Sequence, residues 1–484
     1  MRKFVTLALF AAVIVVLLCG CQLYNHDYRE DVLEYAMISV DGDLSELDQY
    51  PYLAYVDLRG STCYEEILTY SAAHPDIDVR YNVLLGEKRF DSGAKSVNLN
   101  GYETDFTALY DNLQYLKNLE AVHINQITFT RSELDQLMEK YPNVALTYTV
   151  ELLGRRYEHT VTEMELTHLT PADVDAAAKA LSLLPALTDV KLSVTAATNH
   201  LSVADVRTLV EACPNIRFNY KFDLFSQTIS TQDETLIFDN INIGNDGVEE
   251  IRNALDIMPL CTYVKLDSCE IDNELLAQLR ADYPEKTIAW RVFAGKYSIM
   301  TDEEMLRMPY NLTDAQAEDL KYCNKVKYLD VQEAKITNID FMTSMPGLEC
   351  VVLSHTKITD LSPLSGCSNL TWLELYNCKV SDLTPLAGLS NLKYLNIAGT
   401  RVSDLSAIEK LPIERFNCFK SSVKTNTLDA FEQSHPNCVI TSKGYTLDYG
   451  WRYEDKAGTQ PFPYYAQMIE IFRYNEKGFK GNTK

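Results

Sequence analysis

Basic residues are scarce in this 484-residue sequence, in which 44 Lys and Arg stand against 68 Asp and Glu, a formal net charge of −24. No basic run is longer than a pair such as Arg155 and Arg156. Proteins that bind nucleic acid neutralise phosphates with clustered Lys and Arg, so the composition argues against a nucleic-acid partner. An anionic membrane would also repel the body of the chain, and membrane attachment therefore requires a dedicated anchor.

Recognisable catalytic and metal-binding motifs are also absent. The eight His residues show no His-x-x-x-His spacing and no zinc-type arrangement with Cys, and the sequence has no G-x-S-x-G, P-loop or G-x-G-x-x-G. We therefore predict that the chain is not an enzyme and uses no cofactor or metal. An acid/base pair among the many carboxylates is the remaining route to catalysis, because sequence alone does not show which carboxylates converge.

The cysteines do not form a recognisable disulfide framework. Beyond Cys19 and Cys21, the other ten of the twelve show no Cys-x-x-Cys spacing and no clustering. Cys261 and Cys269 are the one pair worth testing for a disulfide. The sequence leaves open whether they form it.

The N-terminus has the order of an export signal. Arg2 and Lys3 precede an apolar run over residues 4–18, which only Thr6 interrupts, and Leu-Cys-Gly-Cys follows at residues 18–21. This stretch resembles the lipobox of bacterial lipoproteins. The resemblance implies a signal peptide at residues 1–20, a lipid on Cys21, a tether at residues 21–30, and a chain anchored to the cell membrane on its extracytoplasmic face. The alternative is an uncleaved signal anchor, since residues 4–21 approach the ~18 residues that can span a bilayer.

From Val326 onward the sequence repeats itself every 22 residues in the pattern L-x-x-L-x-L-x-x-T-x-I-x-D-L-x-P-L-x-x-L-x-x. The fourth and sixth places alternate with polar residues, which predicts a strand, and the later apolar places close a turn around a shared core. The pattern resembles leucine-rich repeats of the internalin-like type over about residues 326–412. It implies an α/β leucine-rich-repeat solenoid whose strands stack into a parallel sheet, and it suggests surface adhesion and protein recognition.

A longer unit of about 70 residues recurs upstream, marked by Pro75, Pro142, Pro214 and Pro284 at spacings of 67, 72 and 70. Six residues after each proline comes an aromatic residue, followed two positions later by an apolar one: Tyr81 and Val83, Tyr148 and Val150, Tyr220 and Phe222, Trp290 and Val292. Their shared parity predicts that the aromatics face the core. Short strands near residues 97–99, 122–124, 190–192 and 264–266 and helical runs such as 132–141 indicate divergent leucine-rich-like repeats over residues 31–312, followed by regular repeats at 313–420.

The last part of the chain, residues 421–484, departs from the pattern and is predicted to be a capping region. Tyr465, Met468, Ile469 and Phe472 have helical spacing after Pro461 and Pro463. Because an uncovered solenoid end exposes core and strand edge, we expect Trp451 and Tyr453 to pack over the last open turn.

Two columns of the regular repeats could carry chemistry. The thirteenth place holds Asp360, Asp382 and Asp404, which could form a cation ladder, but each lies two residues before Ser362, Thr384 or Ser406, which resembles a hydroxyl cap before the first turn of a helix. We interpret these carboxylates as turn residues. The twentieth place exchanges Cys323 and Cys367 with Met345, Leu389 and Leu411, which predicts buried free thiols.

The concave sheet face, made by the third, fifth, seventh and eighth places, is unusually aromatic. Its candidate binding residues are Tyr328, Trp372, Glu374, Tyr376, Tyr394, Asn396, Arg415 and Phe419. Aromatic rings supply contact area, and neighbouring polar groups supply directional hydrogen bonds. We therefore predict a protein or peptide ligand of unknown identity on this face. The alternatives are a glycan on the same aromatics, or a structural spacer in which the aromatics only stack on one another.

Overall fold

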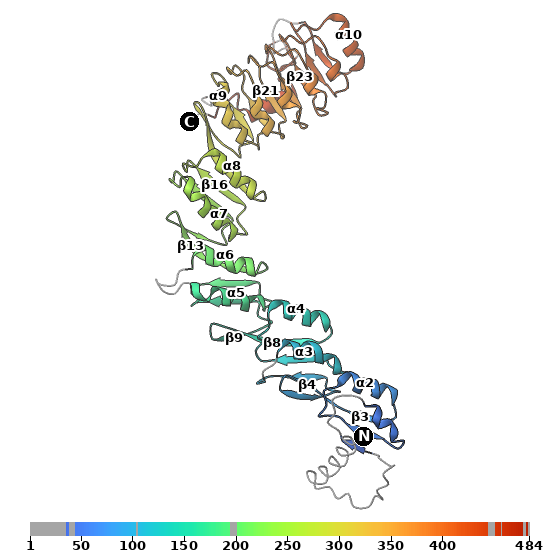
Figure 1. Ribbon diagram of the computed structural model, residues 1–484. Helices are drawn as coiled ribbons and strands as arrows, with labels where there is room; N and C mark the ends of the chain where they lie inside the picture. The colour runs from blue at the N-terminus through green and yellow to red at the C-terminus, as the bar shows by residue number, and fades with distance from the viewer. Residues whose placement is uncertain are drawn as a thin grey trace, which may run out of the picture. The chain divides into compact units, whose positions relative to one another are not determined.

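The structure of the chain is a computed structural model that describes residues 35–37, 44–102, 105–193, 201–443, 451–455, 457–477 and 481–482. The predicted signal peptide, Cys21 and the tether lie outside the described residues. The chain divides into two units, residues 1–220 and 221–484, both built of strands and helices in alternation (Figure 1). Among the described residues, no helix combines the length and the apolar character needed to cross a membrane.

The first unit contains three sets of three parallel strands. They are β1 (Tyr35–Met37), β2 (Tyr55–Asp57) and β3 (Asp78–Arg80); β6 (Ser96–Asn98), β7 (Ala121–Ile124) and β8 (Ala145–Leu152); and β10 (Glu163–Leu166), β11 (Asp189–Leu192) and β12 (Arg217–Asn219). The connecting helices include α2 (Tyr64–Ala73), α3 (Phe106–Asn112), α4 (Arg131–Lys140), α5 (Val174–Ser182) and α6 (Val203–Ala212). The strands and the helix predicted in this part of the sequence are confirmed.

The second unit contains a fourth set of the same kind. Its parallel strands are β15 (Thr235–Asp239), β16 (Tyr263–Asp267) and β17 (Thr287–Ala294), connected by α7 (Val248–Asp256) and α8 (Asn273–Asp282). Leu236, Val264 and Ile288 lie next to one another in register and are buried. Each such set thus buries one face of its strands, as the alternation in the sequence requires.

After each set, the chain forms an antiparallel hairpin that the sequence did not predict. The hairpins are β4 (Asn82–Leu85) with β5 (Lys88–Asp91), β8 with β9 (Arg155–Glu158), β13 (Lys221–Leu224) with β14 (Gln227–Ser230), and β17 with β18 (Tyr297–Met300). Each has a two-residue turn. Phe225 and Ser226 adopt positive φ angles of 49° and 66°, where Asn-Gly or Asp-Gly is the usual turn sequence. The turn signal is therefore weak at this hairpin, whereas the other three turns each contain a glycine with positive φ, Gly86, Gly154 or Gly295.

The recurring aromatic residues mark the point where the third strand changes from parallel to antiparallel pairing. Tyr81, Tyr148, Tyr220 and Trp290 are all at most 3% exposed, which confirms the prediction that they face the core. Their polar atoms are anchored, because Tyr148 Oη donates to the Leu183 carbonyl at 2.8 Å and Trp290 Nε1 donates to Asn273 Oδ1 at 2.9 Å. Each aromatic thus holds its strand to a neighbouring turn at the start of a hairpin.

The regular repeats form a seven-stranded parallel sheet. Its strands are β19 (Met305–Arg307), β20 (Tyr328–Asp330), β21 (Cys350–Val352), β22 (Trp372–Glu374), β23 (Tyr394–Asn396), β24 (Arg415–Asn417) and β25 (Val439–Thr441). From β20 to β23, paired residues are 22 positions apart, as the period predicts. The sheet begins before and ends after the predicted bounds of 313–420.

Short helical turns lie opposite these strands. They are α9 (Asp314–Ala317) and the 3₁₀ turns η5 (Glu318–Tyr322), η6 (Asp340–Ser344), η7 (Ser362–Leu364), η8 (Thr384–Leu386) and η9 (Ser406–Ile408). The carboxylate of Asp382 accepts hydrogen bonds from the Thr384 amide at 2.8 Å and from its hydroxyl at 2.6 Å, and the same bonds recur for Asp360 and Asp404. The interpretation as turn residues is confirmed, but the carboxylate is the acceptor and the hydroxyl donates to it.

The ten described cysteines are free thiols. Cys261 Sγ lies 3.6 Å from the Tyr263 carbonyl, whereas Cys269 Sγ lies 3.5 Å from the Phe238 carbonyl, so these two thiols do not form the disulfide considered above. Cys323 and Cys367, in the twentieth place of their repeats, are buried as predicted. Burial raises the pKa of the Cys367 thiol to about 11.

Candidate functional site

The predicted concave face consists of side chains that parallel pairing places side by side. Trp372 lies between Cys350 and Tyr394 in register, and Glu374 lies between Val352 and Asn396. Trp372 is 0% exposed and Glu374 is 1% exposed, although both project from the face that a solenoid normally presents to a ligand. Another part of the chain must therefore cover them.

The cover is the C-terminal arm, which we define as described residues 451–477. It contains α11 (Pro463–Ile471), and its buried side chains form one cluster with those of the sheet: Trp451, Tyr465, Met468, Ile469 and Phe472 with Cys350, Val352, Trp372 and Tyr394. The helical spacing was predicted correctly, but the expected location was wrong, because Trp451 packs on the concave face and not over the last turn. That turn is followed instead by α10 (Thr425–Ser434) and β25, and Phe431 of α10 contacts Phe416 with ring centres 4.9 Å apart.

Aromatic stacking dominates the centre of this contact. The ring of Trp372 is stacked on Tyr464 at 5.4 Å between centres with 10° between the planes, and it lies 4.6 Å from Trp451. Phe462 meets Tyr394 edge to face at 5.3 Å. Such pairs contribute about 0.5–1.5 kcal/mol each beyond the burial of area, so the arm is held by several geometrically specific contacts.

A buried ion pair sits beside the stacked rings. Arg452 donates to both carboxylate oxygens of Glu374, at 3.1 Å from Nε and 2.7 Å from Nη2. Glu374 also accepts from Trp372 Nε1 at 3.1 Å and from Ser354 Oγ at 3.4 Å. The two-pronged geometry suits a guanidinium and not an ammonium group, so the site at Glu374 is specific for arginine.

A second buried carboxylate anchors the far end of the arm. Asp330 is 0% exposed, accepts from Tyr474 Oη at 2.9 Å, and has Arg307 Nε at 3.8 Å. Burial raises the pKa of Asp330 to about 6, although the hydrogen bonds from the Gln332 amide and Tyr474 act in the opposite direction. Arg307 in turn donates to the Phe472 carbonyl at 3.1 Å.

The last described residues of the chain are hydrogen-bonded to β19. Asn482 donates from its backbone to the Arg307 carbonyl at 3.0 Å and accepts from the Arg307 amide at 2.7 Å through its side chain. Its side chain also donates to Glu303 at 2.7 Å. Gly481 precedes it with φ +93°, and a Cβ there would lie 2.1 Å from the Arg307 carbonyl oxygen. Only glycine fits this approach.

The predicted binding residues therefore fall into two groups. Six of them are buried or half-buried and have partners in the repeats or the arm: Tyr328, Trp372, Glu374, Tyr394, Asn396 and Arg415. Arg415 lies 4.0 Å from the ring centre of Phe462, and Tyr394 Oη donates to Glu414 at 3.0 Å. Tyr376 and Phe419 remain half-exposed and do not belong to the cluster. The eight residues thus do not form one open surface, which corrects the expectation of an accessible concave face.

The arm residues that complete this site were missed because their partners are far away in the sequence. Arg452 and Glu374 are separated by 78 residues, and Tyr474 and Asp330 by 144. One signal in the sequence could have suggested that the arm packs on the concave face. Both are rich in aromatic residues, and the face carries carboxylates in its strands.

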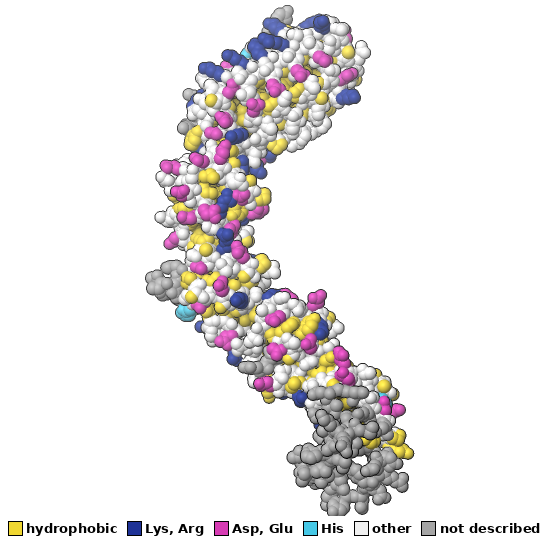
Figure 2. Space-filling model, in the orientation of Figure 1, with side chains coloured by type: hydrophobic (Ala, Val, Ile, Leu, Met, Phe, Trp, Pro, Cys, Tyr) yellow, Lys and Arg dark blue, Asp and Glu magenta, His cyan; other side chains and the backbone are white. Residues whose placement is uncertain are grey.

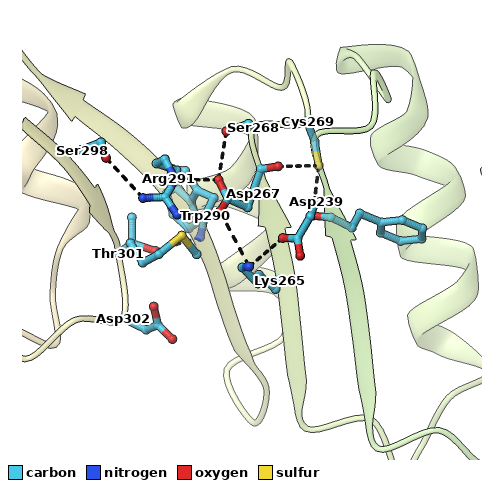
Figure 3. A network of polar contacts seen from close by, with 12 residues as sticks. Asp239, Lys265, Asp267, Ser268, Cys269, Trp290, Arg291, Ser298, Thr301 and Asp302 are labelled. Carbon is cyan, nitrogen blue, oxygen red and sulfur yellow. Dashed lines mark hydrogen bonds and ion pairs between the residues drawn. The ribbon is translucent and has the colours of Figure 1, made fainter. Parts of the chain in front are cut away.

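A further charged surface lies on β15, β16 and β17 (Figure 3). Arg291 donates to both oxygens of Asp267 at 2.7 and 2.6 Å, and Lys265 lies 2.6 Å from Asp239. The Arg291 guanidinium holds the pKa of Asp267 below its ordinary value. These charges satisfy one another across the strands, so we assign them a structural role. No group of three His, Cys, Asp or Glu in the described part of the chain is arranged to hold a metal.

Comparison with known proteins supports the repeat fold. Residues 368–410 match the family model described as leucine-rich repeats in two copies. No curated protein sequence matches the chain. Among solved structures, an internalin from Listeria monocytogenes is 18% identical over 74% of this chain and 84% of its own, with a TM-score of 0.29.

A leucine-rich-repeat protein of Leptospira interrogans is 16% identical, with 83% of this chain and 92% of that chain covered and a TM-score of 0.26. The functional domain of internalin J from Listeria monocytogenes is 14% identical, with 73% of this chain and 65% of that chain covered and a TM-score of 0.24. At these TM-scores the solved structures carry no conclusion about this chain. The 22-residue strand register and the family match at residues 368–410 place the regular repeats in the α/β leucine-rich-repeat solenoid fold.

Proposed function

We propose that this chain is a lipid-anchored, extracytoplasmic binding protein that takes a peptide segment of a protein partner on the concave face of its regular repeats. The observation that carries the proposal is that this face already holds a peptide segment, the C-terminal arm. The arm is held by stacked rings at Trp372 and by an arginine-specific carboxylate at Glu374. A partner segment with aromatic residues and an arginine would use the same contacts.

The arm would then be exchanged for the partner. Buried ion pairs give specificity more than stability, because desolvation offsets much of their attraction. An arm held partly by Arg452 and Glu374 and partly by a buried carboxylate at Asp330 is therefore better suited to exchange than a purely apolar cap. The competing interpretation is a spacer protein whose arm never leaves, and the mutual packing of Trp372, Tyr394 and Trp451 favours it.

Partner capture under competition separates the two. The chain from residue 22 onward is immobilised and exposed to solubilised envelope proteins of the producing cell, with and without excess synthetic peptide of residues 451–474. We expect Arg452→Met, which weakens the arm without altering the face, to increase capture, and the peptide to suppress it. The matched control is Arg80→Met, an exposed cation of the first unit. Capture that responds to neither change would favour the spacer.

Anchoring is tested separately. Lipidation at Cys21 predicts that the full chain incorporates labelled palmitate and sediments with membranes, and that Cys21→Ala abolishes both. Membrane association without label in the unaltered chain would instead indicate the uncleaved signal anchor.

A further inference from the structure

A column of cations runs along one edge of the regular repeats. The tenth place, just after each strand and its turn, holds Lys335, Lys357, Lys379 and Arg401 in four successive repeats, and all four are exposed. Figure 2 shows Lys and Arg side chains gathered along one edge of this part of the chain. The column is not apparent in the sequence, because successive cations are 22 positions apart and form no basic run.

The backbone holds these cations in register. The amide of Lys357 donates to the Ile336 carbonyl at 3.1 Å, that of Lys379 to Ile358 at 3.0 Å, and that of Arg401 to Val380 at 2.9 Å. The intervening ninth place is buried, with Thr356, Cys378 and Thr400 in the interior. Adjacent cations therefore follow the strand spacing of about 4.8 Å on a rigid edge.

Their charges are not neutralised within the described chain. On the same repeats, Lys327 is paired with Glu304 at 2.7 Å and Lys393 with Glu414 at 2.8 Å. None of the four tenth-place cations has a carboxylate oxygen within 4.0 Å among the described residues, although the chain carries 68 acidic residues. The four cations thus form one aligned positive column, and the exposed Asp360, Asp382 and Asp404 that follow three residues later bond to the amides of their own turns.

Rings and neutral polar groups lie beside the column. Tyr376 and Phe419, in the seventh place, are half-exposed, and His355 and Asn377, in the eighth, are exposed. The rings of His355 and Tyr376 meet edge to face at 4.7 Å, and Asn377 Nδ2 lies 3.2 Å from His355 Nδ1. The eighth place has a left-handed backbone in every repeat, with φ from 54° at Lys420 to 66° at Gly399, so this strip has one fixed geometry along its length.

We propose that this edge, defined by the four cations with Tyr376 and Phe419, binds an anionic polysaccharide that carries one acidic group per sugar. Carboxylates or phosphates of successive sugars meet successive cations, because the length of one sugar ring is close to the spacing of adjacent strands. Tyr376 and Phe419 stack on ring faces. An extended acidic peptide fits less well, since its side chains on one face recur every ~6.7 Å and lose register with the column.

This site shares Tyr376 and Phe419 with the predicted concave face but is centred on the tenth-place cations and takes another ligand class, and its test does not depend on the arm. The chain from residue 22 onward is titrated with polygalacturonate, with neutral dextran, with poly-L-glutamate and with a thymidine oligonucleotide, at low and at physiological salt. We expect binding to polygalacturonate that weakens with salt and no binding to dextran.

Charge variants identify the surface. Changing Lys335, Lys357, Lys379 and Arg401 together to Gln should lower the apparent affinity for polygalacturonate about 30-fold, which is what four exposed ion pairs of ordinary strength supply together. The matched control changes four scattered exposed lysines, Lys325, Lys410, Lys424 and Lys443, to Gln, which removes the same charge and should leave the affinity within about threefold. Thermal unfolding of both variants checks that the fold is intact.

The remaining outcomes overturn the proposal. Absence of polygalacturonate binding, or an equal loss in the two charge variants, shows that the column is not a site. Equal or tighter binding of poly-L-glutamate or the oligonucleotide shows that the ligand is not a glycan. Replacing Tyr376 and Phe419 with Ala should weaken polygalacturonate binding further, and an unchanged affinity refutes the stacking contribution.

Discussion

Removing the guanidinium of Arg452 should release the C-terminal arm while leaving the sheet folded. In Arg452→Met, Glu374 keeps only the hydrogen bonds from Trp372 Nε1 and Ser354 Oγ. Breaking a buried ion pair by removing one partner costs about 3–5 kcal/mol. The Glu374 carboxylate avoids this penalty if the arm detaches and water reaches the carboxylate. The loss of stability in the variant is therefore limited to the free energy with which the arm docks on the sheet.

Hydrogen exchange of α11 and of strands β20–β24 gives the readout. We expect exchange in residues 463–471 to accelerate strongly in Arg452→Met, while the strand amides remain protected and the midpoint of urea unfolding shifts only modestly. Glu374→Gln in the same chain should restore part of the protection, because a neutral amide is cheaper to bury than an unpaired carboxylate. The cycle of the two variants measures the coupling.

Arg473→Met is the matched control, since Arg473 belongs to the same arm but forms an exposed pair with Glu476. It should change the exchange of α11 little. Unchanged exchange in Arg452→Met, or the same acceleration in both variants, would refute the view that the buried pair holds the arm.

Three further predictions concern charge, backbone and turns. Burial raises the pKa of Asp330 to about 6 in the folded chain, against about 3.9 in the unfolded chain, so the free energy of unfolding falls as pH rises from about 4 to about 6. Asp330→Asn should remove this pH dependence, which amounts to at most about 3 kcal/mol, in urea unfolding measured at pH 4.5 and 7. An unchanged pH dependence in the variant would contradict the assignment to Asp330. Gly481→Ala should destabilise the chain end by about 1–3 kcal/mol and expose the Arg307 amide to exchange, whereas unchanged protection of that amide would show that the approach is not tight. Asp382→Ala should slightly lower the midpoint of thermal unfolding, because the Thr384 amide loses its acceptor. Calcium should not shift the midpoint of the unaltered chain, and a calcium-dependent midpoint would indicate that the aspartates bind cations.

The regular repeats could be predicted well because each of their signals is local. A strand of three residues, a buried turn and a capping carboxylate all lie within 22 positions, so periodicity places Leu373, Val380 and Leu386 in the core without any knowledge of distant contacts. The same reasoning identified Trp290 and its counterparts as core residues from their common parity. Burial in the structure agrees with each of these.

The arm and the hairpins could not be predicted in the same way. Helical spacing shows that Tyr465, Met468 and Phe472 share one face, but it does not show which surface covers them, since the sheet face and the last turn are both apolar. The hairpin turn at Phe225 and Ser226 lacks the residues that usually mark positive φ. The cation column does not appear as a basic run in the sequence, because its four residues recur at the 22-residue period of the repeat.

The hairpins that follow the three-strand sets bear on how the chain responds to force. The last strands of the four hairpins end at Asp91, Glu158, Ser230 and Met300, and each set lies before its hairpin as a separate sheet. A chain pulled from both ends should therefore lose these sets one at a time, and each loss of about 70 residues would release about 240 Å of contour length, less the folded length of the set. The force trace would then show countable steps.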